Sequence, residues 1–208
     1  AQDNMQVANC TTPANYFHIL RRQMKRDFRK PLILMTPKSL LRHKRAVSDL
    51  SEMAGETTFH RLLWDDAEMK PNTVSVKLRK DREIRRVVLC TGKVYYDLLE
   101  EREKRGLDDI YLLRVEQLYP FPAKALINEL SRFKDAEIVW CQEEPKNMGA
   151  WSFIEPYLEW VLDRIGTTKR RARYAGRQAA ASPAVGTMSK HVQQLEQFLE
   201  EALGEASA

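Results

Sequence analysis

The sequence predicts an α/β fold with a doubly wound sheet, and three features support that prediction. Between residues 86 and 165, short apolar runs alternate with segments of ten or so residues that have helical periodicity. The runs are rich in β-branched residues and have few polar gaps, which is typical of strands buried on both faces. Gly92 and Pro145 follow two of the runs closely and end them. Helices should therefore cover both faces of a mostly parallel sheet.

The first part of the chain predicts a strand-helix-strand unit. Residues 4–10 are a short strand candidate, and we expect the apolar run 31–35 to be a buried strand. Between them, Thr12 stands as a helix N-cap and Pro13 as the first helical residue. The helix should be amphipathic, with basic residues on one face and an apolar stripe on the other, formed by Tyr16, Phe17, Leu20 and Met24. The crossover between the two strands should be right-handed.

The remaining elements follow in order after a weakly patterned connection. A capped turn at 39–44 and a short amphipathic piece at 47–53 lead into residues 52–85, a variable connection in which we expect strands at 59–64 and 73–76. The sequence then predicts strands at 86–91, 110–115, 137–141 and 171–174, helices at 94–105, 123–133, 151–165 and 189–203, and a rigid turn at 116–122. The small residues at 179–186 should either pack closely against backbone or lie as an extended loop.

Composition excludes several classes of protein. The net charge of +5 is spread over short basic clusters with interspersed acids, and no motif interleaves aromatic and basic residues as RNA-binding proteins do. Cys10, Cys90 and Cys141 are odd in number and widely spaced, which indicates reduced core thiols rather than disulfides or a metal site. No apolar run reaches the length of a membrane span and no signal peptide pattern opens the chain. We expect a soluble protein that binds neither nucleic acid nor membrane.

Few residues carry recognisable catalytic chemistry. The histidines have no partner at a motif spacing, and His43 and His191 stand in polar contexts typical of a surface. Glu143 and Glu144 could form a carboxylate pair for acid–base work. Neighbouring residues on a strand point to opposite faces, however, so one is more simply structural and the other solvated or ion-paired.

Two basic features leave alternatives open. The strand, glycine and helix around Gly92 could present backbone N–H groups to an anion, or could simply pack a helix on a sheet. A cluster near the carboxyl end could bind an acidic partner or form a solvated edge; its members are Arg171, Arg173, Arg177 and Lys190.

Long motifs cover nearly the whole chain. They are TPKSLLRH (36–43), TGKVYYDLLEER (91–102), RVEQLYPFP (114–122), WCQEEPxNxGAW (140–151) and RYAGRxAxASPAVG (173–186). Together they resemble the carboxyl-terminal region of the thiamine-diphosphate-dependent 2-oxoglutarate dehydrogenase component, the decarboxylating first enzyme of its complex. Only residues 52–80 depart from the pattern. The resemblance implies that residues 1–38 are the end of a pyrimidine-binding domain and residues 39–208 a transketolase-like carboxyl-terminal domain.

The resemblance also implies an activity that this stretch does not complete. The parent enzyme decarboxylates 2-oxoglutarate oxidatively and transfers the succinyl group to a lipoyl group, using thiamine diphosphate and Mg²⁺. Its activating glutamate, metal motif and active-site histidines should lie upstream, so we expect this chain alone to hold no catalytic residue, no metal and no cofactor, and to be inactive. Two alternatives stay open, namely the same chemistry on 2-oxoadipate and a non-catalytic regulatory module that binds an acyl-CoA-like anion.

Partners and sites follow from the same resemblance. It implies a homodimer, the lipoyl-bearing dihydrolipoyl succinyltransferase and dihydrolipoyl dehydrogenase of the complex, and an acyl-CoA effector. The effector phosphate is expected near Arg29, Lys30, Lys38 and Arg42. An interface is expected at Gln142, Glu143, Glu144 and Trp151, since aromatic residues are favoured at interfaces. The expected setting is central carbon metabolism (the tricarboxylic acid cycle and glycolysis), in a bacterial cytoplasm or a mitochondrial matrix.

Overall fold

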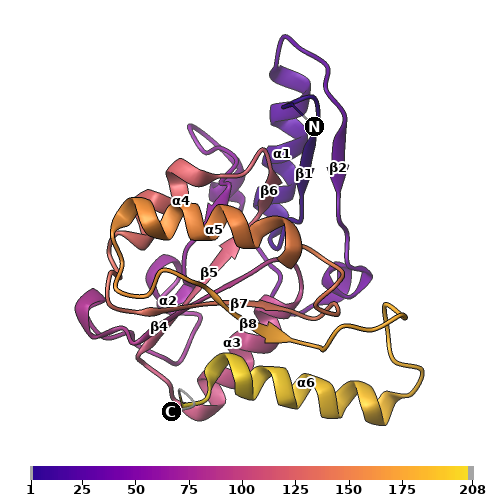
Figure 1. Ribbon diagram of the computed structural model, residues 1–208. Coiled ribbons are helices and arrows are strands. Elements are labelled where there is room, and N and C mark those ends of the chain that lie inside the picture. Colours follow the sequence, from indigo (N-terminus) through magenta and orange to yellow (C-terminus); the bar gives the residue numbers. More distant parts are fainter. Residues whose placement is uncertain (1, 206–208) are drawn as a thin grey trace.

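A computed structural model describes residues 2–205 and contains a small and a large sheet (Figure 1). The small sheet has the strand order β2-β1-β6 and the large sheet the order β3-β5-β4-β7-β8. The strands are β1 (Gln6–Ala8), β2 (Leu32–Leu34), β3 (Leu62–Leu63), β4 (Arg86–Cys90), β5 (Ile110–Val115), β6 (Gln117–Tyr119), β7 (Glu137–Gln142) and β8 (Arg173–Gly176). The helices are α1 (Pro13–Lys25), α2 (Asp66–Met69), α3 (Val94–Arg105), α4 (Ala123–Leu130), α5 (Trp151–Ile165) and α6 (Met188–Leu203), with 3-10 turns η1 (Lys38–Arg42), η2 (Leu50–Met53) and η3 (Asp81–Glu83).

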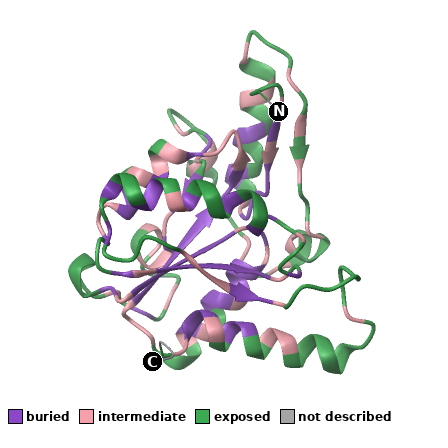
Figure 2. Ribbon diagram, in the orientation of Figure 1, coloured by how far each residue is buried: buried purple, intermediate pink, exposed green. Residues whose placement is uncertain are grey.

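The large sheet confirms the doubly wound prediction. Strands β5, β4, β7 and β8 are parallel, and the short β3 runs antiparallel at the edge. Helices α4 and α5 cover one face, and α3 and α6 cover the other (Figure 1). Side chains along β4 alternate between these layers, because Val87 and Leu89 join the α4 and α5 core whereas Val88 and Cys90 join the α3 and α6 core. Figure 2 shows the buried residues concentrated in these strands.

The element predictions hold best within this sheet. The helix at 94–105 and the strand at 110–115 have the predicted bounds. The last strand begins at residue 173, two residues later than expected, and the last helix begins at 188. The helix predicted at 123–133 is shorter and ends at 130. The small-residue stretch 179–186 is a loop, which is one of the two expected arrangements.

The small sheet combines two distant parts of the chain. Strand β1 pairs in parallel with β2 and antiparallel with β6. Strand β6 lies inside residues 116–122, so the prediction of a rigid turn there was wrong for residues 117–119. Local sequence could not reveal this strand, because its partner β1 lies more than a hundred residues earlier. A cis peptide bond joins Tyr119 to Pro120 directly after it.

Helix α1 starts where the sequence predicts, but a mixed polar and apolar side of it is buried and its predicted apolar face is exposed. Thr12 caps it, since the Thr12 Oγ1 accepts a bond of 3.3 Å from the Asn15 N–H. The buried residues of α1 are Ala14, Asn15, His18 and Ile19, whereas the predicted apolar stripe is exposed, with Met24 at 74%. Strand β2 is likewise only partly covered, and Ile33 at its centre is 45% exposed, so the prediction of a buried strand was wrong. Polar contacts at the start of α1, and not its apolar stripe, set its orientation.

Residues 52–85 are ordered and packed on the large sheet. The predicted strand at 59–64 is reduced to β3, and no strand forms at 73–76. Asp65 is fully buried beside Arg102 of α3, whose Nη2 donates to its Oδ1 over 2.8 Å. Asp65 Oδ2 also accepts from the Leu112 N–H of β5 at 2.7 Å. This buried ion pair fixes the connection to β5 and α3 of the large sheet and its helices.

All three cysteines are free and buried, as the composition predicts. Burial raises the pKa of the Cys10 and Cys90 thiols well above the usual range. Among residues 2–205, no helix combines the length and the apolar character needed to cross a bilayer.

Candidate functional site

The carboxyl edge of the large sheet is the first place to look for a site. In open α/β sheets, ligands bind outside the carboxyl ends of the strands where the strand order reverses. The chain runs from β4 to β5 on one side and then returns to β7 on the other, so the reversal lies between β4 and β7. The loops at this point carry Gly92 and Lys93 after β4, and Glu143 after β7.

The turn between β1 and α1 occupies part of this edge. Gly92 has a φ of +72°, and a side chain added there would collide with the side chain of Asn9. Lys93 closes the other side, because its Nζ pairs with Glu143 at 3.0 Å and Asp97 at 3.1 Å. The chain therefore packs closely at Gly92, which favours simple packing of a helix on the sheet over an anion site at this glycine.

A buried carboxylate holds the same turn. Glu116, directly after β5, is fully buried, and its Oε2 accepts from the Thr11 N–H and from Asn15 Nδ2, both at 2.9 Å. Its Oε1 accepts from the Thr11 hydroxyl at 2.5 Å. Burial raises the pKa of Glu116, although Arg114 and these hydrogen bonds favour the ionised form. The Tyr96 hydroxyl donates to the Thr11 carbonyl oxygen at 2.7 Å. The segments after β4 and β5 and the helix α3 therefore all contact this one turn. These elements belong to the large domain, which is the large sheet with the helices that cover it.

The acidic loop after β7 is built around Gln142. The Gln142 Oε1 accepts from Trp140 Nε1 and from the Trp151 N–H, both at 3.0 Å. Its Nε2 donates to the Met148 carbonyl oxygen at 2.7 Å and to the Pro145 carbonyl oxygen at 3.2 Å. One fully buried amide thus fixes the loop and the start of α5 together.

The four residues predicted as an interface have different environments. Gln142 and Trp151 are buried inside this chain, where they hold the loop. Glu143 is half-buried in its pair with Lys93, and Glu144 is exposed. Glu143 and Glu144 follow β7 and do not lie within it, so the argument from alternate strand faces does not apply to them. The interface itself stays a prediction, with Glu144 as its most accessible member.

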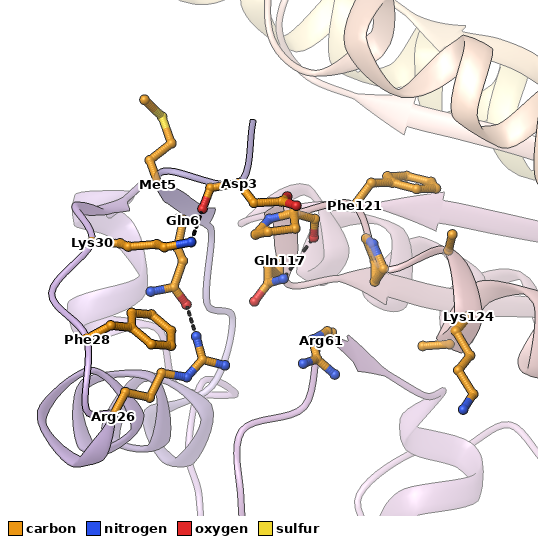
Figure 3. A pocket seen from close by; sticks show the side chains of 14 residues that line it. Asp3, Met5, Gln6, Arg26, Phe28, Lys30, Arg61, Gln117, Phe121 and Lys124 are labelled. Carbon is orange, nitrogen blue, oxygen red and sulfur yellow. Dashed lines mark hydrogen bonds between the residues drawn. The ribbon is translucent and has the colours of Figure 1, made fainter. Parts of the chain in front are cut away.

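A second site is a pocket of about 370 Å³ between the small sheet and the large domain (Figure 3). Four cationic side chains line it together with the single carboxylate of Asp3; they are Arg26, Lys30, Arg61 and Lys124. Phe28 lies between two of them, with Arg26 Cζ 5.1 Å and Lys30 Nζ 5.3 Å from its ring centroid. Phe121 lines the opposite wall. The pocket therefore combines positive charge with aromatic surface.

Of the four predicted effector residues, the structure places one in this pocket. Lys30 lines it, and its Nζ donates to the Asp3 carbonyl oxygen at 2.5 Å. Arg29 is exposed nearby and donates to the carbonyl oxygens of Arg26 and Phe28. Lys38 and Arg42 belong to η1, beyond the other end of β2, and a span of eight extended residues corresponds to roughly 25 Å.

Sequence reasoning missed the other cations of the pocket for a physical reason. Arg26 is the C-cap of α1 and belongs to the basic residues expected along that helix, which by themselves indicate no pocket. Arg61 and Lys124 lie far apart in sequence, and only the folding of β3 and α4 beside the small sheet brings them together. The available signal was local, since Arg26, Phe28 and Lys30 form one basic and aromatic segment.

The remaining titratable candidates are structural. His18 is buried and its Nε2 lies 2.8 Å from the Glu52 carbonyl oxygen. His43 is half-buried with its ring 4.4 Å from that of Tyr96, and His191 is exposed. Of the predicted basic cluster, Arg173 pairs with Glu137 at 2.8 Å and Arg177 donates to the Glu143 carbonyl oxygen at 2.5 Å.

Comparisons with known proteins agree with the motifs. The family model for the 2-oxoglutarate dehydrogenase C-terminal region matches residues 47–203, and the model for the transketolase pyrimidine-binding domain matches residues 1–44. The chain is 78% identical over 204 residues to proteins named 2-oxoglutarate dehydrogenase E1 component from Brucella anthropi, Brucella ovis and Brucella canis. These alignments cover 98% of this chain and 20% of each relative, so the chain spans about a fifth of their length. The chain therefore belongs to the 2-oxoglutarate dehydrogenase C-terminal family, with the end of a transketolase-like pyrimidine-binding domain before it.

Proposed function

We propose that this chain is the carboxyl-terminal part of an enzyme that decarboxylates 2-oxoglutarate oxidatively and transfers the succinyl group to a lipoyl group. The observation that carries this proposal is the 78% identity to named E1 components over nearly the whole chain. The cofactor of that enzyme is thiamine diphosphate with Mg²⁺, and its setting is the tricarboxylic acid cycle. Its partners are a second copy of the enzyme, the lipoyl-bearing succinyltransferase and dihydrolipoyl dehydrogenase.

Within that enzyme, this segment serves assembly and support of the active site. Residues 2–205 contain no group of three or more His, Cys, Asp or Glu side chains that could hold a metal ion. They do offer apolar surface to further parts of the assembly, on the outer sides of α1 and β2. Phe17 is 42%, Leu20 44% and Ile33 45% exposed there.

The test compares two proteins under one set of conditions. The reduction of an artificial electron acceptor is measured with 2-oxoglutarate, thiamine diphosphate and Mg²⁺, for this chain and for the longer polypeptide that contains it. We expect turnover by the longer polypeptide and none by this chain. Turnover by the longer polypeptide with 2-oxoadipate but not with 2-oxoglutarate would replace the substrate assignment. Turnover by this chain would contradict its assignment to assembly.

A second function is regulation by an acyl-CoA-like anion, and the cationic pocket between the domains favours it. Arg61 and Lys124 form no ion pair within residues 2–205, which leaves both available to phosphate oxygens. Phe28 and Phe121 provide surface for a flat ring or an acyl chain. If this pocket binds the effector, the site lies at the junction of the two domains, nearer to Lys30 than to Lys38.

Calorimetric titration with acetyl-CoA tests this second function. Arg61→Met and Lys124→Met should each weaken binding about tenfold, since a charge-assisted hydrogen bond contributes about 1.5 kcal/mol or more. Lys38→Met and Arg42→Met are matched controls at the far end of β2 and should leave the affinity unchanged. Weaker binding in the controls than in the pocket variants would move the site to η1. Absence of binding to the unmodified chain would exclude the regulatory function for this segment.

A further inference from the structure

The β1–α1 turn of the pyrimidine-binding unit lies where related sheets place a ligand. The carboxyl edge of the large sheet contacts Asn9 at Gly92, and Thr11 at Glu116 and Tyr96. The backbone continues this contact, since the Asn9 N–H donates to the Glu116 carbonyl oxygen at 2.8 Å. One domain of the protein thus binds the other through the part of the fold that commonly binds small molecules.

Glu116 is the group that makes this contact specific. Its three hydrogen bonds all come from the pyrimidine-binding unit, two from Thr11 and one from Asn15. No cationic group in the described part of the chain forms an ion pair with it. A buried carboxylate is costly unless hydrogen bonds satisfy it, so its presence demands these donors in one arrangement.

Apolar packing is too limited to fix the unit by itself. The hydrophobic cluster of the small sheet contains only four buried residues, which are Ala8, Cys10, Ile19 and Phe59. By contrast, Asn15 is held by polar bonds on both sides, because its amide also exchanges two bonds of 2.9 Å with the backbone of His60. Directional hydrogen bonds therefore decide how α1 lies against the large domain.

We propose that Glu116 is a positioning residue whose carboxylate fixes the β1–α1 turn, and with it α1, on the carboxyl edge of the large sheet. Removal of the carboxylate releases α1 while the large sheet remains folded. In the longer enzyme this contact sets the placement of the pyrimidine-binding domain over the carboxyl-terminal domain. That consequence rests on the proposed function, whereas the docking of α1 does not depend on any reaction.

Native-state hydrogen exchange of this chain tests the proposal. In Glu116→Ala, the amides of residues 17–25 should exchange about 100-fold faster, since several charge-assisted bonds are lost. The amides of β4 and β7 should keep their rates. Glu116→Gln should show a smaller effect, because its carbonyl oxygen can still accept from the Thr11 N–H while its amide donates to the Thr11 hydroxyl.

The matched control is Glu129→Ala. Glu129 is also buried, at 8% exposure, and accepts from Trp64 Nε1, Tyr111 and Arg132, all within the large domain. This variant should accelerate exchange in α4 and leave α1 unchanged. Equal acceleration of amide exchange in α1 and β4 of Glu116→Ala would show general destabilisation and overturn the proposal. Unchanged exchange rates in α1 would overturn it as well.

A second variant covers the case in which Glu116→Ala does not fold. Asn15→Ala removes one donor on the side of α1 and keeps the carboxylate, and it should accelerate exchange in α1 selectively. In the double variant Asn15→Ala with Glu116→Gln, the acceleration of amide exchange in α1 should be less than the product of the accelerations in the two single variants, as expected for groups in direct contact. Independent effects would overturn the proposal. None of these readouts involves 2-oxoglutarate, so their failure is distinguishable from failure of the proposed activity.

Discussion

Replacement of Arg102 by Met should destabilise the protein strongly, because it leaves the buried carboxylate of Asp65 without its counter-charge. Both side chains are fully inaccessible to solvent. After the change, Asp65 keeps only two backbone donors, the Leu112 N–H at 2.7 Å and the Ala67 N–H at 2.9 Å. Breaking a buried ion pair on one side costs about 3 to 5 kcal/mol, which is the expected loss in the free energy of unfolding.

Thermal and urea unfolding, followed by circular dichroism, measure this loss. For a chain of this length, each kcal/mol corresponds to about 2 to 4 °C, so the midpoint should fall by about 6 to 20 °C. Asp65→Asn in the Arg102→Met background should restore part of the stability. The neutral amide removes the unpaired charge, and its oxygen can still accept from the Leu112 N–H.

Arg171→Met is the matched control. Arg171 pairs with Glu159 at 3.2 Å, but its side chain is 86% exposed, so the same substitution should leave the midpoint unchanged within error. A midpoint of Arg102→Met no lower than that of Arg171→Met would refute the reasoning. It would mean that the connection 52–85 contributes nothing through Asp65 to the packing of the large domain.

Three further substitutions test other contacts by the same unfolding measurements. Gly92→Ala should lower the free energy of unfolding by about 1 to 3 kcal/mol more than Gly55→Ala does. Both glycines have positive φ, but only at Gly92 would the new methyl group meet the side chain of Asn9. Equal losses in the two variants would contradict this. Gln142→Glu should cost about 3 kcal/mol, since a carboxylate would replace the amide that donates to three carbonyl oxygens; an unchanged midpoint would show that the loop rearranges freely. Glu137→Gln should reduce the loss of stability that the unmodified protein shows between about pH 5 and 3. Burial raises the pKa of Glu137, but its bonds to Arg173 and Arg86 outweigh this and hold the pKa below its usual value. The stabilisation by ionised Glu137 therefore exists above the unfolded pKa near about 4.3 and disappears as the pH falls. If the free energy of unfolding of Glu137→Gln fell as steeply with decreasing pH as that of the unmodified protein, Glu137 would not contribute to the acid sensitivity.

Local periodicity predicted the large sheet well because its signals are local. The run 110–115 is apolar throughout, and the helix 94–105 begins after Gly92 and ends before Gly106, which adopts φ of +62°. Periodicity failed for α1, since a stripe shows that a helix is amphipathic but not which side the neighbouring elements cover. Asn15 and His18 are buried there because their polar partners come from residues 52, 60 and 116.

The candidate sites show the same division. Lys30 was predicted from its place near the domain junction, but Arg61 and Lys124 join it only through tertiary folding. Glu116 stands in the motif RVEQLYPFP, but the motif assigns it no role, since a single glutamate after a strand is common. The rule that functional groups collect at the carboxyl ends of parallel strands would have selected it, because it directly follows β5.

The buried carboxylate of Glu116 and the half-buried carboxylate of Glu137 should respond to acid with opposite signs. Burial raises the folded pKa of Glu116, so protonation favours the folded chain, and stability at this site decreases as the pH rises from the unfolded value through the folded value. The hydrogen bonds from Thr11 and Asn15 offset part of the cost of the ionised carboxylate. Its geometry tolerates the proton, because a protonated Oε1 can donate to the Thr11 hydroxyl while Oε2 keeps its two donors. Glu137 instead holds Arg86, which donates to the Ala202 and Gly204 carbonyl oxygens at the end of α6. Acid should therefore loosen the end of α6 while the contact between the two domains persists.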